Sequence, residues 1–375
     1  MFIQRIYQNL SSYLQEGKVL VIFGPRQVGK TTLLNIFLKD TSYKYKIDTG
    51  ENINLQSLFA SRDLNKIISY AEGYDLIVID EAQKIPLIGS GLKMLVDSLP
   101  KIRIIVTGSS SFELAGQIGE PLTGRKNTLT LFPIAQLELK NIYNNFELKE
   151  KLEDWLIYGS YPEVVTSRTK EKKIDRIKEL YESYLLKDVL ELERVKGSKV
   201  LMDLLRLLAF QIGSEVSLSE LGRQLGIDSK TVARYLDIFE KAFVVYNLRG
   251  YSRNLRKEIT KKSKYFFYDN GIRNAIINNF NPIDSRNDVG QLWENYLFIE
   301  RVKKNAYTKT YANYYFWRTW DNKEVDFVEE RDGKLFGYEF KWGDKKTKPP
   351  KDWVETYKNS EYAVINKENY LDFIT

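Results

Sequence analysis

The sequence predicts an α/β fold whose first third is a parallel sheet with helices on both faces. Three short apolar runs, at residues 18–24, 75–81 and 101–110, carry this prediction. The runs are nearly continuous in apolar residues, which is typical of strands that are buried on both faces. Helical stretches separate them, and strands that alternate with helices form parallel sheets.

Length and composition limit what this fold can be. A chain of 375 residues favours two or three domains over one. No apolar run reaches the roughly 20 residues of a membrane span, and residues 1–18 do not resemble a secretory signal. The chain has no Cys and no His, which excludes disulfides and argues against a zinc site. We therefore expect a cytoplasmic protein without a membrane partner, whose acid–base chemistry uses carboxylates, Lys, Tyr, Ser, Thr or metal-bound water.

The sequence GPRQVGKT at residues 24–31 matches the Walker A pattern G-x-x-x-x-G-K-[ST], between an apolar strand and a helix. Glycines let the backbone wrap so that its N–H groups face phosphates, and the helix N-terminus adds positive potential. Lys30 should reach the β and γ phosphates, and the Thr31 hydroxyl should bind Mg²⁺. We expect ATP and Mg²⁺ as cofactors, with the nucleotide bound by Gly24, Pro25, Arg26, Gln27, Val28, Gly29, Lys30, Thr31 and Thr32.

The second apolar run ends in Asp80 and Glu81, as in the Walker B pattern. A carboxylate at a strand end can hold Mg²⁺ through water, which is the role expected of Asp80. Glu81 would orient and polarise the attacking water, in a chain that has no His. The two patterns together predict ATP hydrolysis rather than a pair of acids that caps a helix.

Two further positions are candidates for the catalytic site. A polar group at the end of the third run would lie beside the γ-phosphate, and both Thr107 and Ser109 are candidates, with a simple turn as the alternative. Arg125 precedes an expected strand at residues 128–132. It could point out of its own subunit and stabilise charge on a neighbour's nucleotide, or be an ordinary surface Arg. Action in trans would require a homo-oligomer, and we expect a hexameric ring.

This order of motifs resembles an AAA-type ATPase core. The sequences GPRQVGKTTLL, VIDEAQK, IVTGSSS and LTGRKNTLTLFPIAQLEL resemble a family of archaeal and bacterial ATPases whose C-terminal half carries a domain of unknown function. GSYPEVV, SYLLKDVLEL, RYLDIFEKAFVV and KYFFYDNGIRNAI are also similar to that family, so the resemblance covers nearly the whole chain. We expect an ATPase core at residues 1–137, a helical lid or connector at 138–200, a winged helix-turn-helix at 201–262 and a nuclease-like domain at 263–375.

The expected winged helix depends on a helix, a short turn and a second helix. Residues 217–226 predict a helix that Gly226 stops, and Asp228 or Ser229 should cap the next one. A strand-like segment, VVYNLRGY, follows and makes the unit winged. In the second helix, the residues with inward spacing are Val232, Leu236, Phe239 and Phe243.

Positive charge is concentrated in the same segment. Residues 217–262 hold ten Lys and Arg against five Asp and Glu, so five of the chain's seven net positive charges lie there. Cationic side chains on a helix or hairpin displace counterions from a phosphate backbone, independently of base sequence. The alternative is a solvated face on a scaffolding winged helix. The residues expected to bind DNA are Lys230, Arg234, Arg249, Arg253, Arg256 and Lys257.

A hairpin is predicted around the turn Asp332-Gly333. The register that follows places Asp326 opposite Glu339. Facing carboxylates destabilise a sheet unless a cation lies between them. The same register puts Asp326, Glu339 and Lys341 on one face, and it puts a second set of side chains on the other, apolar face: Val325, Phe327, Phe340 and Trp342.

This arrangement resembles the PD-(D/E)xK site of Holliday-junction resolvase-like nucleases, which implies a restriction-endonuclease-like α/β domain. The resemblance implies that Asp326 and Glu339, with the Phe340 carbonyl, hold Mg²⁺, that Lys341 orients water and that Glu294 completes the site. One departure is that the strand has EVD in place of a Pro-Asp pair. The alternative is an exposed charged hairpin with ion pairs worth ~0–1 kcal/mol each.

Together these features predict an ATP-hydrolysing AAA-type enzyme that binds and remodels or processes DNA, including branched DNA. DNA recognition would be independent of sequence or specific for structure. A nucleotide-dependent switch that binds protein partners, without motor or nuclease activity, is the alternative. A third candidate is a Mg²⁺-dependent nuclease that ATP regulates.

Overall fold

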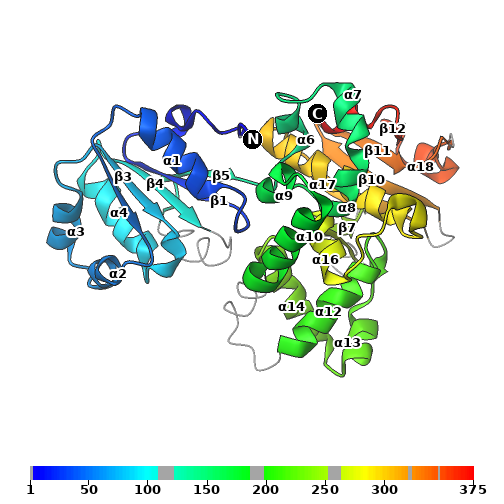
Figure 1. Cartoon of the computed structure of the whole chain (residues 1–375), viewed down its shortest axis with the longest axis horizontal. Coiled ribbons are helices and arrows are strands. Elements are labelled where there is room, and N and C mark those ends of the chain that lie inside the picture. Colours follow the sequence, from blue (N-terminus) through cyan, green and yellow to red (C-terminus); the bar gives the residue numbers. More distant parts are fainter. Residues whose placement is uncertain (1–2, 109–121, 186–197, 252–262, 320–322, 345–346) are drawn as a thin grey trace. The chain divides into compact units, whose positions relative to one another are not determined.

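The computed structural model describes the chain except for residues 1–2, 109–121, 186–197, 252–262, 320–322 and 345–346 (Figure 1). The chain forms two compact units. We call Gln4–Pro133 with Lys241–Phe243 the N-terminal unit, and Ile134–Glu240 with Val244–Thr375 and Ile3 the C-terminal unit. No helix among the described residues is long and apolar enough to cross a membrane.

The N-terminal unit is built on a five-stranded sheet, sheet A, with the order β2-β3-β4-β1-β5. Every pairing in it is parallel, as the sequence predicts. Strand β4 lies between β1 and β3, so the ends of these three strands meet at one edge. The strands are β1 Lys18–Phe23, β2 Tyr45–Thr49, β3 Leu76–Asp80, β4 Arg103–Gly108 and β5 Lys126–Thr130, and the α-helices are α1 Lys30–Asp40, α2 Ile53–Ala60, α3 Leu64–Ala71 and α4 Ile88–Ser98.

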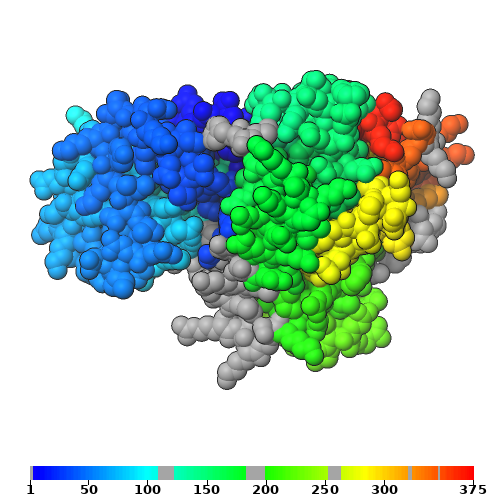
Figure 2. Space-filling view, in the orientation of Figure 1, coloured from blue at the N-terminus to red at the C-terminus, as the bar shows by residue number. Residues whose placement is uncertain are grey.

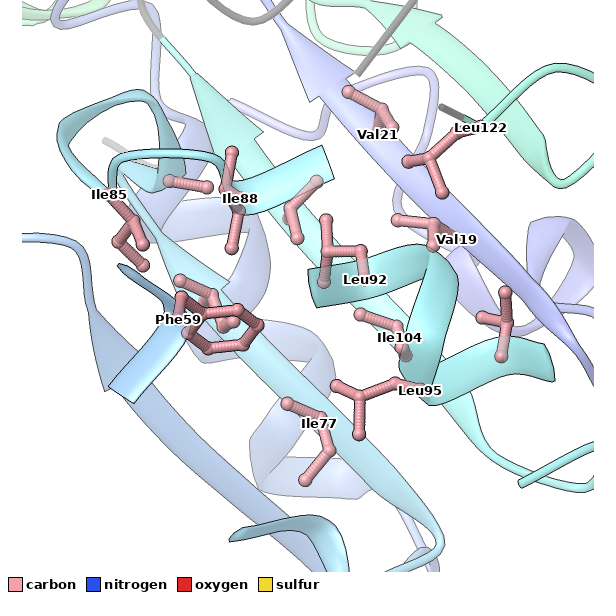
Figure 3. Packing of buried hydrophobic residues seen from close by; sticks show 14 of the residues in the cluster. Val19, Val21, Phe59, Ile77, Ile85, Ile88, Leu92, Leu95, Ile104 and Leu122 are labelled. Carbon is pink, nitrogen blue, oxygen red and sulfur yellow. The ribbon is translucent and has the colours of Figure 1, made fainter. Parts of the chain in front are cut away.

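A hydrophobic core lies between sheet A and helices α2, α3 and α4. In Figure 3, Leu92 and Leu95 of α4 lie over strand residues such as Ile104. Gly91 permits this packing, since a Cβ there would lie 2.2 Å from the Phe59 ring of α2. Successive side chains of a strand point to opposite faces of the sheet. The strand residues that alternate with those of the core are also buried, so both faces of the sheet are covered. They are Leu20, Ile22, Val78 and Ile105.

The C-terminal unit contains a seven-stranded sheet, sheet B, with the order β12-β11-β10-β9-β7-β8-β6. Two pairings, β7 with β9 and β11 with β12, are parallel, and the others are antiparallel. Sheet B therefore contains strands from both sides of residue 262, where the sequence predicts a domain boundary. That boundary stays a prediction. The strands are β6 Glu215–Val216, β7 Val245–Gly250, β8 Ser263–Phe267, β9 Asn313–Arg318, β10 Glu324–Arg331, β11 Lys334–Phe340 and β12 Ser360–Ile365.

Helices surround sheet B. The longest helix within the described residues, α17 (Val289–Tyr307), has buried residues along most of its length. In Figure 2, the teal-green surface of α7 and α8 adjoins the red surface of the C-terminal residues, and Lys149 donates to the Glu368 carbonyl at 3.2 Å. The remaining helices are α6 Gln136–Leu139, α7 Asn145–Glu150, α8 Leu152–Tyr158, α9 Pro162–Thr166, α10 Lys170–Glu179, the π-helix Leu180–Leu185, α12 Ser198–Phe210, α13 Leu218–Leu225, α14 Ser229–Lys241, α16 Asn270–Ile276, α18 Lys351–Thr356 and α19 Tyr370–Ile374.

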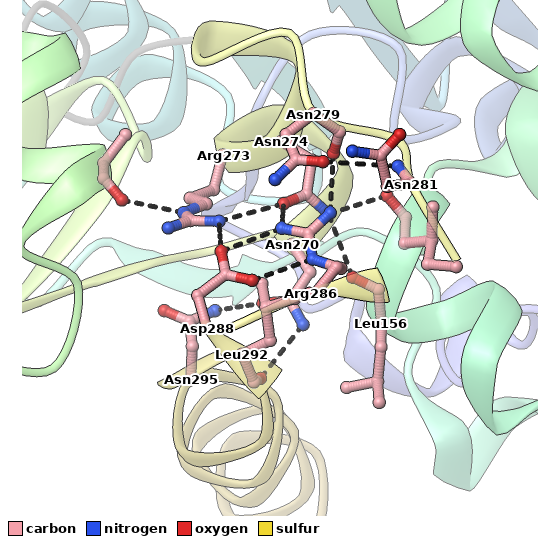
Figure 4. A network of polar contacts seen from close by, with 12 residues as sticks. Leu156, Asn270, Arg273, Asn274, Asn279, Asn281, Arg286, Asp288, Leu292 and Asn295 are labelled. Atoms are coloured by element: carbon pink, nitrogen blue, oxygen red, sulfur yellow. Dashed lines mark hydrogen bonds and ion pairs between the residues drawn. The ribbon is translucent and has the colours of Figure 1, made fainter. Parts of the chain in front are cut away.

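Helix α16 connects several of these elements through buried polar groups (Figure 4). Asn274 Nδ2 donates to the Leu156 carbonyl of α8 at 3.0 Å. Arg273 Nε donates to the Ala209 carbonyl of α12 at 2.7 Å. The Arg273 guanidinium also forms an ion pair with Asp288, the residue that precedes α17. Buried polar side chains that satisfy backbone carbonyls in this way fix how neighbouring helices are placed.

The predicted hairpin is confirmed, but a bulge changes one of its faces. Strands β10 and β11 pair Phe327 with Tyr338, the register that the turn predicts. Along its other edge β10 pairs with β9, and the register of that pairing shifts at a β-bulge between Val325 and Val328. Val325 therefore packs in the cluster around Trp353 of α18, whereas the Phe327 ring lies against a Phe of α17. The prediction that Val325 and Phe327 share a face is wrong for this reason.

Candidate nucleotide-binding site

The loop at residues 24–29 connects β1 to α1 and has the backbone conformation of a phosphate-binding loop. Gly24 has φ +153°, and a Cβ there would lie 2.0 Å from the Leu131 carbonyl oxygen. Gly29 has φ +96°, which L side chains rarely adopt. Lys30, 5% exposed, donates from Nζ to the carbonyls of Gly24 at 2.8 Å and Pro25 at 2.7 Å. Its ammonium therefore lies over the loop, where the sequence predicts the phosphates.

The Asp80 carboxylate is the centre of the site. Thr31 Oγ1 at the start of α1 donates to Asp80 Oδ2 at 2.7 Å, and the fully buried Thr107 hydroxyl of β4 donates to Asp80 Oδ1. Thr107 Oγ1 also accepts a hydrogen bond from the Glu81 amide at 3.0 Å. A carboxylate next to a hydroxyl is an oxygen donor set that suits Mg²⁺. Ser109 lies outside the described residues, so the choice of γ-phosphate sensor stays a prediction.

Glu81 is held by contacts that the sequence does not reveal. It has a left-handed backbone, φ +52°, which is strained for a residue with a side chain. Gly50 permits this, because a Cβ there would lie 2.1 Å from the Glu81 carbonyl oxygen. Gln83 Nε2 donates to Glu81 Oε2 at 2.6 Å and orients the carboxylate. Gln83 is in the string VIDEAQK, and its spacing from Glu81 is the only sequence signal for this role.

Arg5 is a second residue that sequence reasoning missed. Its buried guanidinium donates to the Val28 carbonyl in the phosphate loop and, from Nη2, to the Phe132 carbonyl at 2.7 Å. Arg5 therefore ties the loop to the segment that follows β5. Its two partners are 23 and 127 residues away in sequence, so no local pattern indicates the contact.

Arg125 lies far from the phosphate loop of its own chain. Its carbonyl accepts from the Val19 amide at 2.8 Å, so it is at the start of β1 and β5, whereas the loop follows the end of β1. At about 3.3 Å per residue, β1 separates them by roughly 17–20 Å. Its guanidinium pairs with Asp97 of α4 at 2.6 Å. Arg125 cannot reach its own nucleotide across that distance, and its action in trans stays a prediction.

The four predicted nuclease-like residues lie near one another in the C-terminal unit. The Phe340 amide donates to Asp326 Oδ2 at 2.8 Å, and Lys341 pairs with Glu339 at 2.5 Å. Burial, together with Glu294 and Glu339, raises the pKa of Asp326 to about 8. Among the described residues, no group of three His, Cys, Asp or Glu is placed to hold a metal ion. The predicted Mg²⁺ site at Asp326 and Glu339 thus stays a prediction.

The described residues also contain a buried polar cluster that connects two motifs of unassigned role. The Ser160 amide of GSYPEVV donates to Asp269 Oδ2 of KYFFYDNGIRNAI at 2.6 Å. Lys303, 1% exposed, donates to Glu300 Oε1 at 2.7 Å and to Ser160 Oγ at 3.2 Å. Burial raises the pKa values of Asp269 and Glu300, and the Lys303 ammonium opposes both shifts. The cluster also binds the start of α6, where the Gln136 amide donates to Glu300 at 2.7 Å.

Three of the predicted DNA-binding residues are described and exposed. Lys230 and Arg234 lie on α14, and Arg249 lies on β7. The other three, Arg253, Arg256 and Lys257, lie outside the described residues.

Asp228 caps α14, accepting from the amides of Lys230 at 2.8 Å and Thr231 at 2.9 Å. This resolves the open choice between Asp228 and Ser229 as the cap.

Comparison with known proteins agrees with this geometry. Residues 16–140 match a family model described as an AAA domain. Residues 149–282 and 289–371 match two domains of unknown function, DUF8612 and DUF4143. The match and the site together support an AAA-type P-loop ATPase core with an NTP-hydrolysing activity.

The relatives leave the role of the whole chain open. An uncharacterized protein of Mycobacterium tuberculosis, Rv2008c, is 27% identical over 88% of this chain and 71% of its own length. An uncharacterized protein of Haemophilus influenzae is 25% identical over 86% of this chain and 82% of its own. Among solved structures, the Walker-type ATPase PABY2304 of Pyrococcus abyssi is 15% identical over 72% of this chain and 94% of its own, with a TM-score of 0.47.

Replacing Arg5 should weaken nucleotide binding. In Arg5→Ala the Val28 and Phe132 carbonyls lose their shared donor, and a lost buried hydrogen bond to a charged group is worth about 1.5–3 kcal/mol. We expect the Kd for an ATP analogue to rise about 10- to 100-fold, measured by fluorescence titration. Arg5→Lys should also bind weakly, because one ammonium cannot replace the guanidinium fork. The exposed control Lys66→Ala should bind as the wild type does, and wild-type affinity in Arg5→Ala would contradict the role.

Replacing Lys303 should destabilise the protein in a pH-dependent way. Lys303→Met leaves two buried carboxyl groups without their cation, which should lower the free energy of unfolding by about 3–5 kcal/mol at pH 8. A carboxyl whose pKa is raised on folding contributes stability that is present below its ordinary pKa and lost as pH rises. The difference in free energy of unfolding between the wild type and Lys303→Met should therefore become smaller toward pH 4. Urea unfolding at several pH values measures it.

Lys304→Met is a matched control for that experiment. Lys304 is the next residue of α17 and donates to the backbone carbonyls of Asp372 and Phe373. We expect this variant to lose about 1 kcal/mol. Equal losses in the two lysine variants would contradict the role of Lys303 as a counter-ion.

Proposed function

We propose that the chain is an ATP-hydrolysing enzyme that binds DNA through its C-terminal unit and remodels or processes it. The observation that carries the ATPase part is the convergence of five side chains at one edge of sheet A. They come from the start of α1 and from the ends of β3 and β4: Lys30, Thr31, Asp80, Glu81 and Thr107.

Each of these residues has a distinct part in hydrolysis. When ATP binds, the Lys30 ammonium would leave the carbonyls of Gly24 and Pro25 and contact oxygens of the β and γ phosphates. Thr31 and Asp80 would hold Mg²⁺, which neutralises charge on the phosphates when it is bound. The Glu81 carboxylate, oriented by Gln83, accepts a hydrogen bond from the attacking water.

The DNA-binding part is supported by the order of elements in the C-terminal unit. Helix α12, strand β6, helices α13 and α14, and strands β7 and β8 follow one another as in a winged helix, with β8 paired to both β6 and β7. Gly226 ends α13 with φ +68°, and a Cβ at Gly222 would lie 2.6 Å from the Ile227 carbonyl oxygen, so the turn between α13 and α14 is tight. Exposed Lys230 and Arg234 on α14 supply charge for phosphate contacts.

A homo-oligomeric ring, with six subunits as the preferred number, would complete the ATP site. The support is the distance of Arg125 from its own phosphate loop, which leaves a neighbouring subunit as its target. We assign no nuclease step, because the C-terminal carboxylates resemble a nuclease site only in residue type and strand register.

A nucleotide-controlled switch that binds protein partners is the second candidate. A contiguous exposed apolar patch would mark a site for such partners, whereas the most exposed large apolar side chains of the described residues are spread over α2, α7, α12 and the segment before β9. They are Ile53, Phe146, Phe210 and Tyr311, at 75%, 69%, 68% and 87%.

DNA should stimulate ATP hydrolysis, and the stimulation should depend on α14. Lys230→Glu with Arg234→Glu should weaken binding of linear and four-way DNA and reduce the slope of log K against log salt by about 2. Fluorescence anisotropy at several salt concentrations measures this. Charge reversal at Lys170 and Lys172 of α10 is the control and should change little. Neither DNA binding nor stimulation in the wild type would favour the switch.

The hydrolytic site itself has a separate test. Lys30→Ala should lower ATP turnover by at least about 100-fold, because it removes the charge that faces the phosphates. Glu81→Gln should bind ATP and retain it unhydrolysed, because the amide cannot accept a proton from water. Phosphate release and nucleotide retention on a filter distinguish the two variants, and normal turnover in both would reject the site.

A further inference from the structure

A buried lysine lies among the carboxylates of the C-terminal unit. Lys264 is on β8, in the strand SKYFF, and is 3% exposed. Its Nζ lies 2.6 Å from Glu324 Oε1 of β10 and 3.2 Å from Glu294 Oε1 of α17. An ammonium is strongly destabilised by burial unless it is paired and hydrogen-bonded. The two glutamates supply that pairing, and they hold the pKa of Lys264 above its ordinary value in spite of burial.

Every carboxylate around Lys264 has a partner from the protein. Lys264 pairs with Glu294 and Glu324, Lys341 pairs with Glu339 at 2.5 Å, and the Phe340 amide donates to Asp326. We call this group the Lys264 cluster. Its members are Lys264, Glu294, Glu324, Asp326, Glu339 and Lys341.

The cluster does not fit a resident divalent cation. At a protein site Mg²⁺ keeps several waters and binds to one or two carboxylates, which must carry free negative charge to hold it. Here the carboxylates of Glu294, Glu324 and Glu339 are each already neutralised by an ammonium group of the chain. Two ammonium groups in the cluster would also repel a divalent ion. The facing pair Asp326 and Glu339 already has a cation of the chain, Lys341, which pairs with Glu339, and Lys264 neutralises Glu294 and Glu324 beside it.

We propose that Lys264 is the built-in counter-ion of this cluster, and that the C-terminal unit holds its carboxylates without a divalent metal and does not cleave DNA by metal-assisted hydrolysis. The proposal does not depend on the ATPase site. It also gives Lys264 a structural role, because its ion pairs join β8 of the proposed winged helix to β10 and α17.

Titration with Mn²⁺ tests the proposal on the full-length, nucleotide-free chain. Asp80→Asn serves as the background, so that the N-terminal metal ligand does not contribute to the signal. Electron paramagnetic resonance should show no stoichiometric Mn²⁺ bound, and 5 mM Mn²⁺ should not raise Tm relative to EDTA. One bound Mn²⁺ per chain that is lost on Asp326→Asn would overturn the proposal, and so would metal-dependent DNA cleavage that Asp326→Asn abolishes.

Removing Lys264 should create a Mn²⁺-binding site that the wild-type protein lacks. In Lys264→Met the remaining carboxylates lose their main cation, and Tm should fall by at least about 6 °C. Mn²⁺ should then bind and restore part of the loss. Adding Glu324→Gln, which removes a matching negative charge, should recover much of the Tm even if Lys264→Met alone does not fold. An unchanged Tm with no Mn²⁺ binding in Lys264→Met would show that Lys264 is not the counter-ion.

Discussion

The hydrogen bonds to Asp80 depend on the order of strands in sheet A, and the nucleotide site depends on those bonds. Because β4 lies between β1 and β3, a hydroxyl from β4 and one from the start of α1 reach the same carboxylate from two sides. The Thr107 hydroxyl also accepts from the Glu81 amide, so one hydroxyl positions both Asp80, the proposed ligand of Mg²⁺, and Glu81, the proposed orienter of water. An antiparallel arrangement would place these chain segments at opposite edges.

Sequence patterns could predict those features that depend on neighbouring residues. The loop between β1 and α1, the acids Asp80 and Glu81 at the end of β3, and the turn at Asp332 and Gly333 each depend on a few consecutive residues. Arg5 and Lys264 could not be found in this way, because their partners lie tens of residues away in sequence. The bulge in β10 is a third case. Counting residues from the turn gives the pairing of β10 with β11. The extra residue of β10 opposite β9 accompanies the packing of Val325 against α18 and of Phe327 against α17, which no count along the sequence shows.

Helix α17 shows why the C-terminal unit is hard to predict from periodicity. Its buried polar residues face different partners: Glu294 binds Lys264, Glu300 binds Lys303, and Arg301 forms a bidentate pair with the fully buried Glu329 of β10 at 2.7 and 2.9 Å. A helix surrounded by protein does not show a clear apolar stripe. The sequence GQLWENYLFIERVKK therefore identifies a helix but not the directions in which its charges point.

The backbone after β5 is anchored on both sides of Pro133. On one side, Arg5 fastens the Phe132 carbonyl to the phosphate loop. On the other side, the Ile134 amide donates to the Ser160 carbonyl at 2.8 Å, in the C-terminal unit. Only Pro133, whose ring fixes its φ, separates the two anchored residues. Because the loop and Phe132 share the Arg5 guanidinium, a ligand that displaced the loop would also change how Phe132 is held.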